Sequence, residues 1–234
     1  GLDLVGLTIA GPKAREVLQK CCKTDVSHDV MRFMAVREMD VGMTPAIVGR
    51  VSYSGDLGYE IWVKPASFAR LYDDLMAAGT DFDIRPFGAR ALNALRLEKN
   101  YGSWGREYRP LYGPVEVGLD RFVAYDKPAD FIGKKAALVE RDSGGSKRLI
   151  SLAVDAIDAD VIGDEPVSID GAVVGWVTSG GFAHASKTSV ALAMVPKEFA
   201  LRNDGWTVEL LGQSLKASLI NEPLFDATTS RMRS

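Results

Sequence analysis

The N-terminal part of the chain changes several times between the hydrophobic period of a strand and that of a helix. The strands that this pattern predicts cover residues 4–10, 33–41, 46–63 and 82–84. The helices cover 12–22, 68–79 and 86–99, and two of them begin at a proline. This β-α-β-β-α-β order is typical of the split βαβ unit of ferredoxin-like folds.

Beyond Asp142–Ser146, a polar stretch rich in Gly and Ser, the pattern contains short strands alone. The predicted strands cover 148–154, 165–169, 172–178, 189–195, 206–211 and 213–220. Gly, Asp and Asn turns separate them, as in a small antiparallel β-barrel. The fold class predicted is therefore α+β, with one domain over residues 1–142 and a barrel domain over 147–234.

The most informative stretch is the predicted hairpin over residues 51–63. Alternation places Tyr59, Ile61 and Val63 on one face, and Glu60 with Trp62 on the other. An acid beside an aromatic suits a flat ligand with amide-like N–H donors, because the ring stacks and the carboxylate accepts paired hydrogen bonds.

The register of this hairpin leaves an alternative open. If residues 54–58 form the turn, Tyr53 faces Tyr59 and Ser52 faces Glu60. Arg50 then lies diagonal to Glu60, and a cross-strand ion pair would explain the acid without a ligand.

Composition narrows the classes of function. The chain has 234 residues, a net charge of −3 and 47% hydrophobic residues, which is ordinary for a globular protein and gives no general attraction to nucleic acid. No apolar run approaches the ~20 residues that span a bilayer. The only cysteines, Cys21 and Cys22, are adjacent and are expected to be buried in a reducing compartment, so we expect a cytoplasmic protein.

Several sources of chemistry are missing from the sequence. It contains no Gly-x-Gly-x-x-Gly, no Walker A motif and no Gly-x-Ser-x-Gly elbow. His28 and His184 are isolated, so we expect neither a metal site nor a catalytic triad. We also expect no flavin site in this chain.

Arginines gather around the predicted helix over 86–99 and the loop after it. They are a candidate site for a carboxylate-bearing ligand, or they form solvated ion pairs with Glu98, Glu107 and Glu116. In the same loop, Tyr101 and Trp104 either stack on a ligand or fill a seam between domains.

Four blocks, in order, resemble the aminomethyltransferase family, meaning the glycine-cleavage T protein and its relatives. They read Tyr-Ser-Gly-Asp-Leu-Gly-Tyr-Glu at 53–60, Leu-Arg-Leu-Glu at 95–98, Pro-Val-Glu-Val-Gly-Leu at 114–119 and Phe-Ile-Gly-Lys at 131–134. Within the family, residues 103–108 and 120–123 look most like the C-terminal part of dimethylglycine and sarcosine dehydrogenases.

The resemblance implies a tetrahydrofolate site and specific residues for it. Glu60 matches the family's pterin-binding glutamate, Tyr53 and Tyr59 match its hairpin motif, and Arg96 matches the Leu-Arg-Leu-Glu helix. Trp104 stands where the family often has tyrosine. The family's catalytic aspartate is expected upstream of Gly1, so no catalytic residue is assigned here and the fragment alone is expected to be inactive.

The implied function is one-carbon transfer from an amine, such as glycine, dimethylglycine or sarcosine, to tetrahydrofolate, which forms methylene-tetrahydrofolate. FAD is expected only in an N-terminal half outside this chain. The implied partners are a lipoyl carrier protein or a covalently linked flavin domain. The alternatives are a folate-binding domain without transfer activity and a folate-dependent demethylase. An iron–sulfur maintenance relative is disfavoured because residues 99–106 contain no cysteine.

Overall fold

The computed structural model describes residues 3–234, which form two compact units. One unit contains residues up to Leu95 together with Asp226–Ser234, and the other runs from Arg96 to Phe225. We call them the N-terminal unit and the barrel unit. The chain therefore leaves the N-terminal unit, builds the whole barrel unit, and returns.

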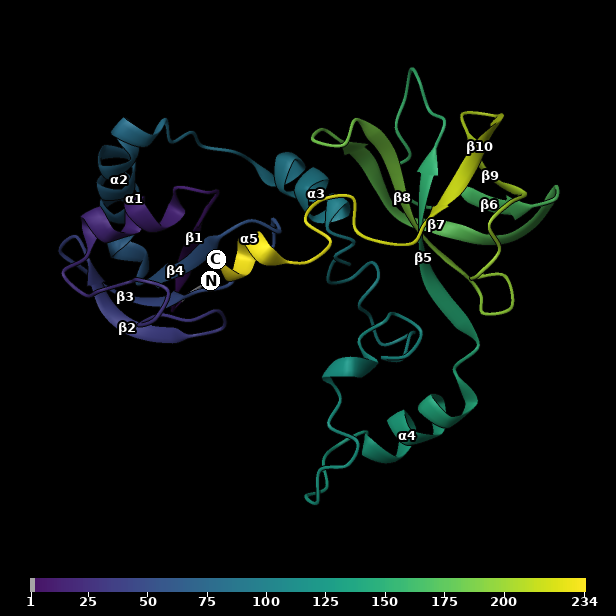
Figure 1. Ribbon diagram of the computed structural model, residues 1–234, viewed down its shortest axis with the longest axis horizontal. Coiled ribbons are helices and arrows are strands. Elements are labelled where there is room, and N and C mark those ends of the chain that lie inside the picture. The colour runs from purple at the N-terminus through teal and green to yellow at the C-terminus, as the bar shows by residue number, and fades with distance from the viewer. Residues whose placement is uncertain (1–2) are drawn as a thin grey trace. The chain divides into compact units, whose positions relative to one another are not determined.

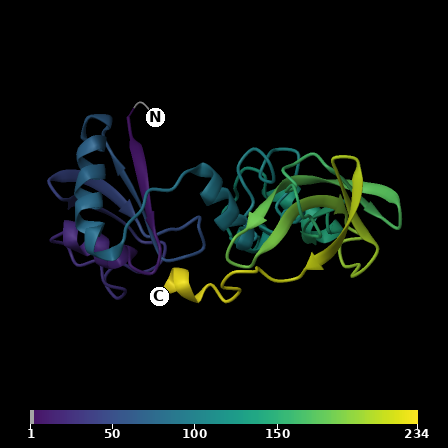
Figure 2. The same ribbon diagram turned by 90° about the horizontal axis from the view of Figure 1, so that it is seen from above.

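The N-terminal unit is a four-stranded antiparallel sheet in the order β1-β4-β3-β2 (Figure 1). Its strands are β1 Val5–Ala10, β2 Val36–Val41, β3 Thr44–Gly49 and β4 Gly58–Val63. The helices α1 Ala14–Cys21 and α2 Phe68–Gly79 lie on the same side of the sheet (Figure 2). Apolar residues of both helices, such as Leu18 and Leu71, share one core cluster with Val48 and Ile61 of the sheet.

Two predicted elements of this unit are wrong in detail. The segment 82–84 contributes no strand, because a 3-10 turn over Thr80–Phe82 ends at Asp83 in the left-handed conformation, with φ of 54°. The third helix, α3 Ala89–Glu98, begins after Pro86 rather than at it.

The barrel unit contains a closed barrel with strand order β10-β5-β8-β7-β6-β9, all pairs antiparallel. Its strands are β5 Lys147–Val154, β6 Pro166–Ile169, β7 Ala172–Ala183, β8 Thr188–Pro196, β9 Trp206–Leu210 and β10 Gln213–Ile220. Closure leaves no unpaired edge. The α+β class and the C-terminal barrel are thus confirmed.

The segment between α3 and the barrel packs within the barrel unit rather than the N-terminal unit. Helix α4 Lys134–Ser143 ends at Gly144, whose positive φ of 76° caps the helix. Glu116 then holds the short turn before β5, because its carboxylate accepts hydrogen bonds from the Ser146 and Lys147 amides at 2.9 and 3.0 Å. The compact units therefore divide at Leu95, whereas Asp142 and Ser143 end helix α4 and residues 144–146 form a tethered turn.

The C-terminal helix and the two cysteines complete the description of the fold. The short helix α5 Ser230–Arg233 lies in the returning C-terminal segment. Cys21 and Cys22 are free, and burial raises the pKa of the Cys22 thiol to about 12. No described helix is long and apolar enough to cross a membrane.

Candidate functional site

Glu60 lies on the face of the sheet that the helices leave uncovered. Tyr59, Ile61 and Val63 of β4 are 0, 0 and 1% exposed, whereas Glu60 and Trp62 between them are half-buried. This is the alternation that the sequence predicts, and it places the acid and the indole on one surface.

The predicted hairpin register is wrong. Strand β3 ends at Gly49, and Glu60 pairs with Gly49 on one side and with Thr8 of β1 on the other. Residues 50–57, which we call the 50–57 loop, form an irregular connection in which Ser52 and Tyr53 belong to no strand. Glycine opposite Glu60 leaves the carboxylate without a neighbouring side chain on that strand.

The indole of Trp62 forms a flat surface beside Glu60. A β-carbon added at Gly6 of β1 would lie 2.9 Å from Trp62 Cδ1, and one added at Gly49 of β3 would lie 3.0 Å from Trp62 Cζ3. The ring therefore extends over both neighbouring strands, and glycine at each position leaves room for it. An aromatic surface of this kind accepts a flat ring by stacking.

The carboxylate of Glu60 has no hydrogen-bond or ion-pair partner among residues 3–234. Burial raises its pKa, and no interaction offsets that effect. Arg50, the alternative partner that the sequence left open, does not bind it. The Arg50 guanidinium is fully buried and donates instead to the Met31 carbonyl at 2.8 Å. A half-buried carboxylate with free acceptor oxygens is suited to binding a ligand with N–H donors.

Tyr59 does not share this surface. Its side chain is in the core of the N-terminal unit, on the face opposite Glu60, and its hydroxyl accepts a hydrogen bond from Arg15 Nε at 3.2 Å. Tyr53 is half-buried in the 50–57 loop. The structure therefore brings Glu60 together with Trp62 and Thr8, and it places Tyr59 apart from them. Thr8 was missed because its position beside Glu60 depends on the β1–β4 pairing.

Arg96 and Trp104 belong to the barrel unit. Arg96 is 2% exposed, donates to the Tyr101 carbonyl at 2.9 Å and lies 3.5 Å from the fully buried Glu107. Glu107 also accepts hydrogen bonds from the Ser103 amide and the Ser179 hydroxyl. The sequence offered solvated ion pairs as the alternative to ligand binding, and the Arg96–Glu107 pair is instead buried. Trp104 is 90% exposed, so its ring is accessible in the loop after α3.

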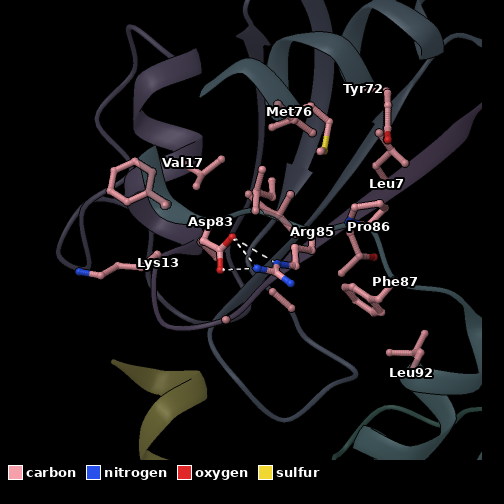
Figure 3. A pocket seen from close by; sticks show the side chains of 18 of the residues that line it. Leu7, Lys13, Val17, Tyr72, Met76, Asp83, Arg85, Pro86, Phe87 and Leu92 are labelled. Carbon is pink, nitrogen blue, oxygen red and sulfur yellow. Dashed lines mark hydrogen bonds and ion pairs between the residues drawn. The ribbon is translucent and has the colours of Figure 1, made fainter. Parts of the chain in front are cut away.

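A separate cavity of about 580 Å³ lies between β1, α2 and the segment before α3 (Figure 3). Its walls are mostly apolar, and the exposed pair Asp83–Arg85 at 3.0 Å supplies its main charges. Glu60 does not line it. Among the described residues, no three His, Cys, Asp or Glu side chains form a group able to hold a metal ion.

Family comparisons match both parts of the chain. Residues 2–127 match the model described as the GCVT N-terminal domain, and residues 147–226 match the glycine cleavage T-protein C-terminal barrel domain. The first match covers more than half of the chain.

Two curated relatives are similar over nearly the whole chain. Mitochondrial dimethylglycine dehydrogenase of Mus musculus is 40% identical over 97% of the chain, and 4-methylaminobutanoate oxidase (formaldehyde-forming) of Paenarthrobacter nicotinovorans is 30% identical over 98%. The chain spans only 26% and 28% of their lengths.

A solved structure has the same fold. The glycine cleavage system aminomethyltransferase T from Bartonella henselae superposes with a TM-score of 0.81 at 26% identity. The match covers 96% of this chain and 60% of that protein.

Proposed function

This chain belongs to the glycine-cleavage T-protein family, and on that basis we propose that it binds tetrahydrofolate through Glu60 as part of a one-carbon transferase. The observation that carries the proposal is the half-buried carboxylate of Glu60, which has no partner among the described residues and lies beside the Trp62 ring. A pterin ring presents adjacent N–H donors and a flat face, and both features match this surface.

Each residue has a distinct part in the proposal. Glu60 accepts the pterin N–H donors, and Trp62 offers its ring as a stacking surface. Tetrahydrofolate, when bound, supplies the nitrogen nucleophiles that receive the carbon. The chain contributes mainly binding and orientation. Tyr53 and Trp104 remain predicted ligand contacts. The burial of Tyr59 and Arg96 favours supporting roles for them.

The donor that we propose is an N-methylated amine whose carbon is made reactive elsewhere in a longer protein. Dimethylglycine dehydrogenase and 4-methylaminobutanoate oxidase are both named for N-methylated substrates. A flavin domain carrying FAD, covalently linked to this chain, is the proposed partner for that oxidation. A glycine-derived aminomethyl group on a lipoyl carrier protein is the second candidate, favoured by the fold match to aminomethyltransferase T.

The first prediction tests folate binding by titration calorimetry. Glu60→Ala should weaken tetrahydrofolate binding to the 234-residue chain by tens to thousands of fold. The loss of one member of a desolvated charged hydrogen bond costs about 2–5 kcal/mol, which corresponds to this range of affinities.

The matched control is Glu38→Ala, which removes an exposed glutamate from β2 of the same sheet. It should leave the affinity unchanged. Equal affinities for the Glu60→Ala variant and the unmodified chain, or no binding by the unmodified chain, would contradict the proposal.

A further inference from the structure

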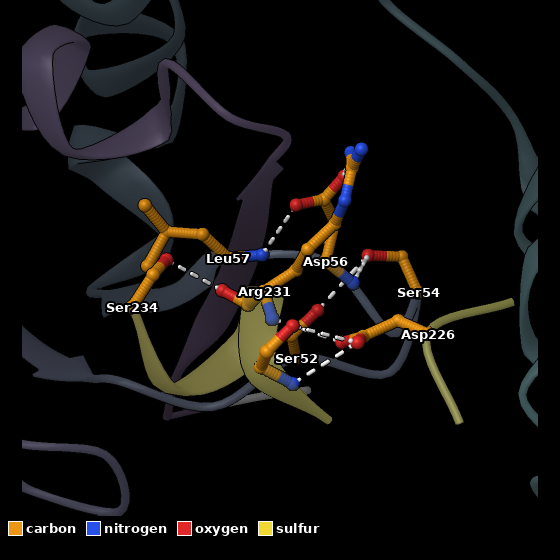
Figure 4. A network of polar contacts seen from close by, with 8 residues as sticks. Ser52, Ser54, Asp56, Leu57, Asp226, Arg231 and Ser234 are labelled. Atoms are coloured by element: carbon orange, nitrogen blue, oxygen red, sulfur yellow. Dashed lines mark hydrogen bonds and ion pairs between the residues drawn. The ribbon is translucent and has the colours of Figure 1, made fainter. Parts of the chain in front are cut away.

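The C-terminal segment, residues 226–234, packs against the 50–57 loop and is here called the strap. Figure 4 shows helix α5 of the strap beside this loop. Arg231 of the strap lies 3.5 Å from the Asp56 carboxylate of the loop. Met232, the next residue, is only 4% exposed, so the strap is anchored by a buried apolar side chain as well. These contacts join positions about 175 residues apart in the sequence.

The strap is an ordered element because Asp226 fixes its first turn. The Asp226 carboxylate accepts hydrogen bonds from the Ser230 amide at 3.0 Å, the Ser230 hydroxyl at 2.9 Å and the Arg231 amide at 2.9 Å. Burial alone would raise the pKa of Asp226, but these hydrogen bonds outweigh it and leave the pKa lowered. The backbone of α5 is therefore held in place where it meets the loop.

Arg50 connects the strap to the start of the loop. Its guanidinium is fully buried and donates through Nη2 to the carbonyls of Met232 and Ser234, while Nη1 donates to Met31. Arg15 also donates to the Ser234 carbonyl, at 2.6 Å. Detachment of the strap would take the Met232 and Ser234 carbonyls from the Arg50 guanidinium, and the loss of acceptors by a charged group is costly.

The end of the loop leads directly to Glu60. The Leu57 amide donates to the Asp56 carboxylate at 2.8 Å, and the Leu57 carbonyl accepts from the Gly11 amide at 2.8 Å. Asp56 thus binds the strap with one oxygen and the loop backbone with the other. Gly58 and Glu60 of β4 follow within a few residues.

We propose that the strap is a positioning element, which holds the 50–57 loop in the conformation that lets a ligand reach Glu60. Arg50, Arg231 and Met232 are positioning residues in this assignment, since each acts through the loop. The effect on ligand affinity rests on the proposed folate function, whereas the effect on the loop itself does not.

Hydrogen exchange of the loop amides, read by mass spectrometry, tests the proposal in the 234-residue chain. Met232→Asp places a charge in a buried position and should detach the strap. Exchange in 50–57 should then rise by about tenfold or more, and tetrahydrofolate affinity should fall by a similar factor. The matched control is Arg233→Asp, which introduces the same side chain at the adjacent exposed residue and should leave both values unchanged.

A milder pair of variants covers the case in which Met232→Asp does not fold. Arg231→Glu reverses the charge facing Asp56 and should raise loop exchange by up to about fivefold, as expected for a half-exposed ion pair. Asp56→Arg in the same chain re-forms the ion pair but removes the acceptor of the Leu57 amide, so it should restore loop exchange in part, with Leu57 itself still exchanging faster. Equal exchange in all variants would overturn the proposal.

The tetrahydrofolate affinity of the variants separates the positioning role of the strap from the folate-binding role of Glu60. Where Glu60→Ala weakens binding but the strap variants do not, the positioning role is wrong. Where Glu60→Ala has no effect while loop exchange still rises, the folate assignment fails and the strap's hold on the loop stands.

Discussion

At the scale of single residues, Glu60 shows a conflict between stability and binding. Burial raises the pKa of its carboxyl group, so the folded chain holds the proton more firmly than the unfolded chain does. Ionisation of Glu60 therefore costs stability. This cost is absent at a pH below the pKa that Glu60 has in the unfolded chain, and it is complete at a pH above the raised pKa of the folded chain. A residue that is unfavourable for folding at neutral pH is suited to a ligand-binding role.

The second prediction follows from the raised pKa of Glu60, which makes ionisation of this group destabilising. Glu60→Gln should raise the melting temperature at neutral pH by up to a few degrees, because it removes the ionisation cost. Solvent screens the half-exposed group, so the gain stays under about 1 kcal/mol. The difference from the unmodified chain should shrink as the pH falls through the raised pKa of Glu60. A lower melting temperature of the variant at neutral pH would show that the carboxylate has a structural partner.

The sequence predicted the face of Glu60 but not its neighbours. Alternation over 59–63 was enough to place Glu60 with Trp62, since period two is a property of the strand alone. The Gly49 pairing was not predictable, because Arg50, the first residue after β3, donates to the backbone of Ser234, which is distant in sequence. Arg96 stays a predicted ligand contact, and the burial of its ion pair was not predictable for the same reason. Its partner Glu107 is buried with Ser179 of the barrel, which no local pattern reveals.

At the scale of elements, the barrel was predicted closely because its turns carry strong signals. Glycine, aspartate and asparagine separate the strands, and the observed bounds differ from the expected ones mainly in β7, which extends to Ala183. The strand predicted at 82–84 failed because Asp83 adopts a left-handed conformation that a hydrophobic pattern does not encode.

The third prediction concerns Gly175, where β7 passes close to β8. A β-carbon at this position would lie 2.2 Å from the Met194 carbonyl oxygen, and backbone cannot yield as a flexible side chain does. Gly175→Ala should destabilise the barrel by about 1–3 kcal/mol, as measured by urea unfolding followed through tryptophan fluorescence. The control is Gly88→Ala, since an added β-carbon there meets no atom within 4 Å. Equal stability of the two variants would contradict the close approach.

At the scale of the whole molecule, the N-terminal unit is built from two separate stretches of the chain. The barrel unit is inserted between the sheet and the strap that completes the N-terminal unit. Each unit has its own hydrophobic core, and the core clusters around Leu71 and around Trp206 share no residue. The strap therefore follows the barrel unit in the sequence, but it folds against the N-terminal unit.

The last prediction uses these separate cores. Leu71 of α2 is fully buried in the core of the N-terminal unit, so Leu71→Ala should destabilise that unit by about 2–5 kcal/mol. Because the strap belongs to the same unit, hydrogen exchange should rise together in β4, the 50–57 loop and α5, while the amides of β8 keep their protection. Ala191→Gly, a small change in the barrel core, is the control and should raise exchange in the barrel strands, β8 included, but not in β4 or α5. If Leu71→Ala raised exchange in β4 but left α5 protected, the strap would not fold with the sheet, and its assignment to the N-terminal unit would be wrong.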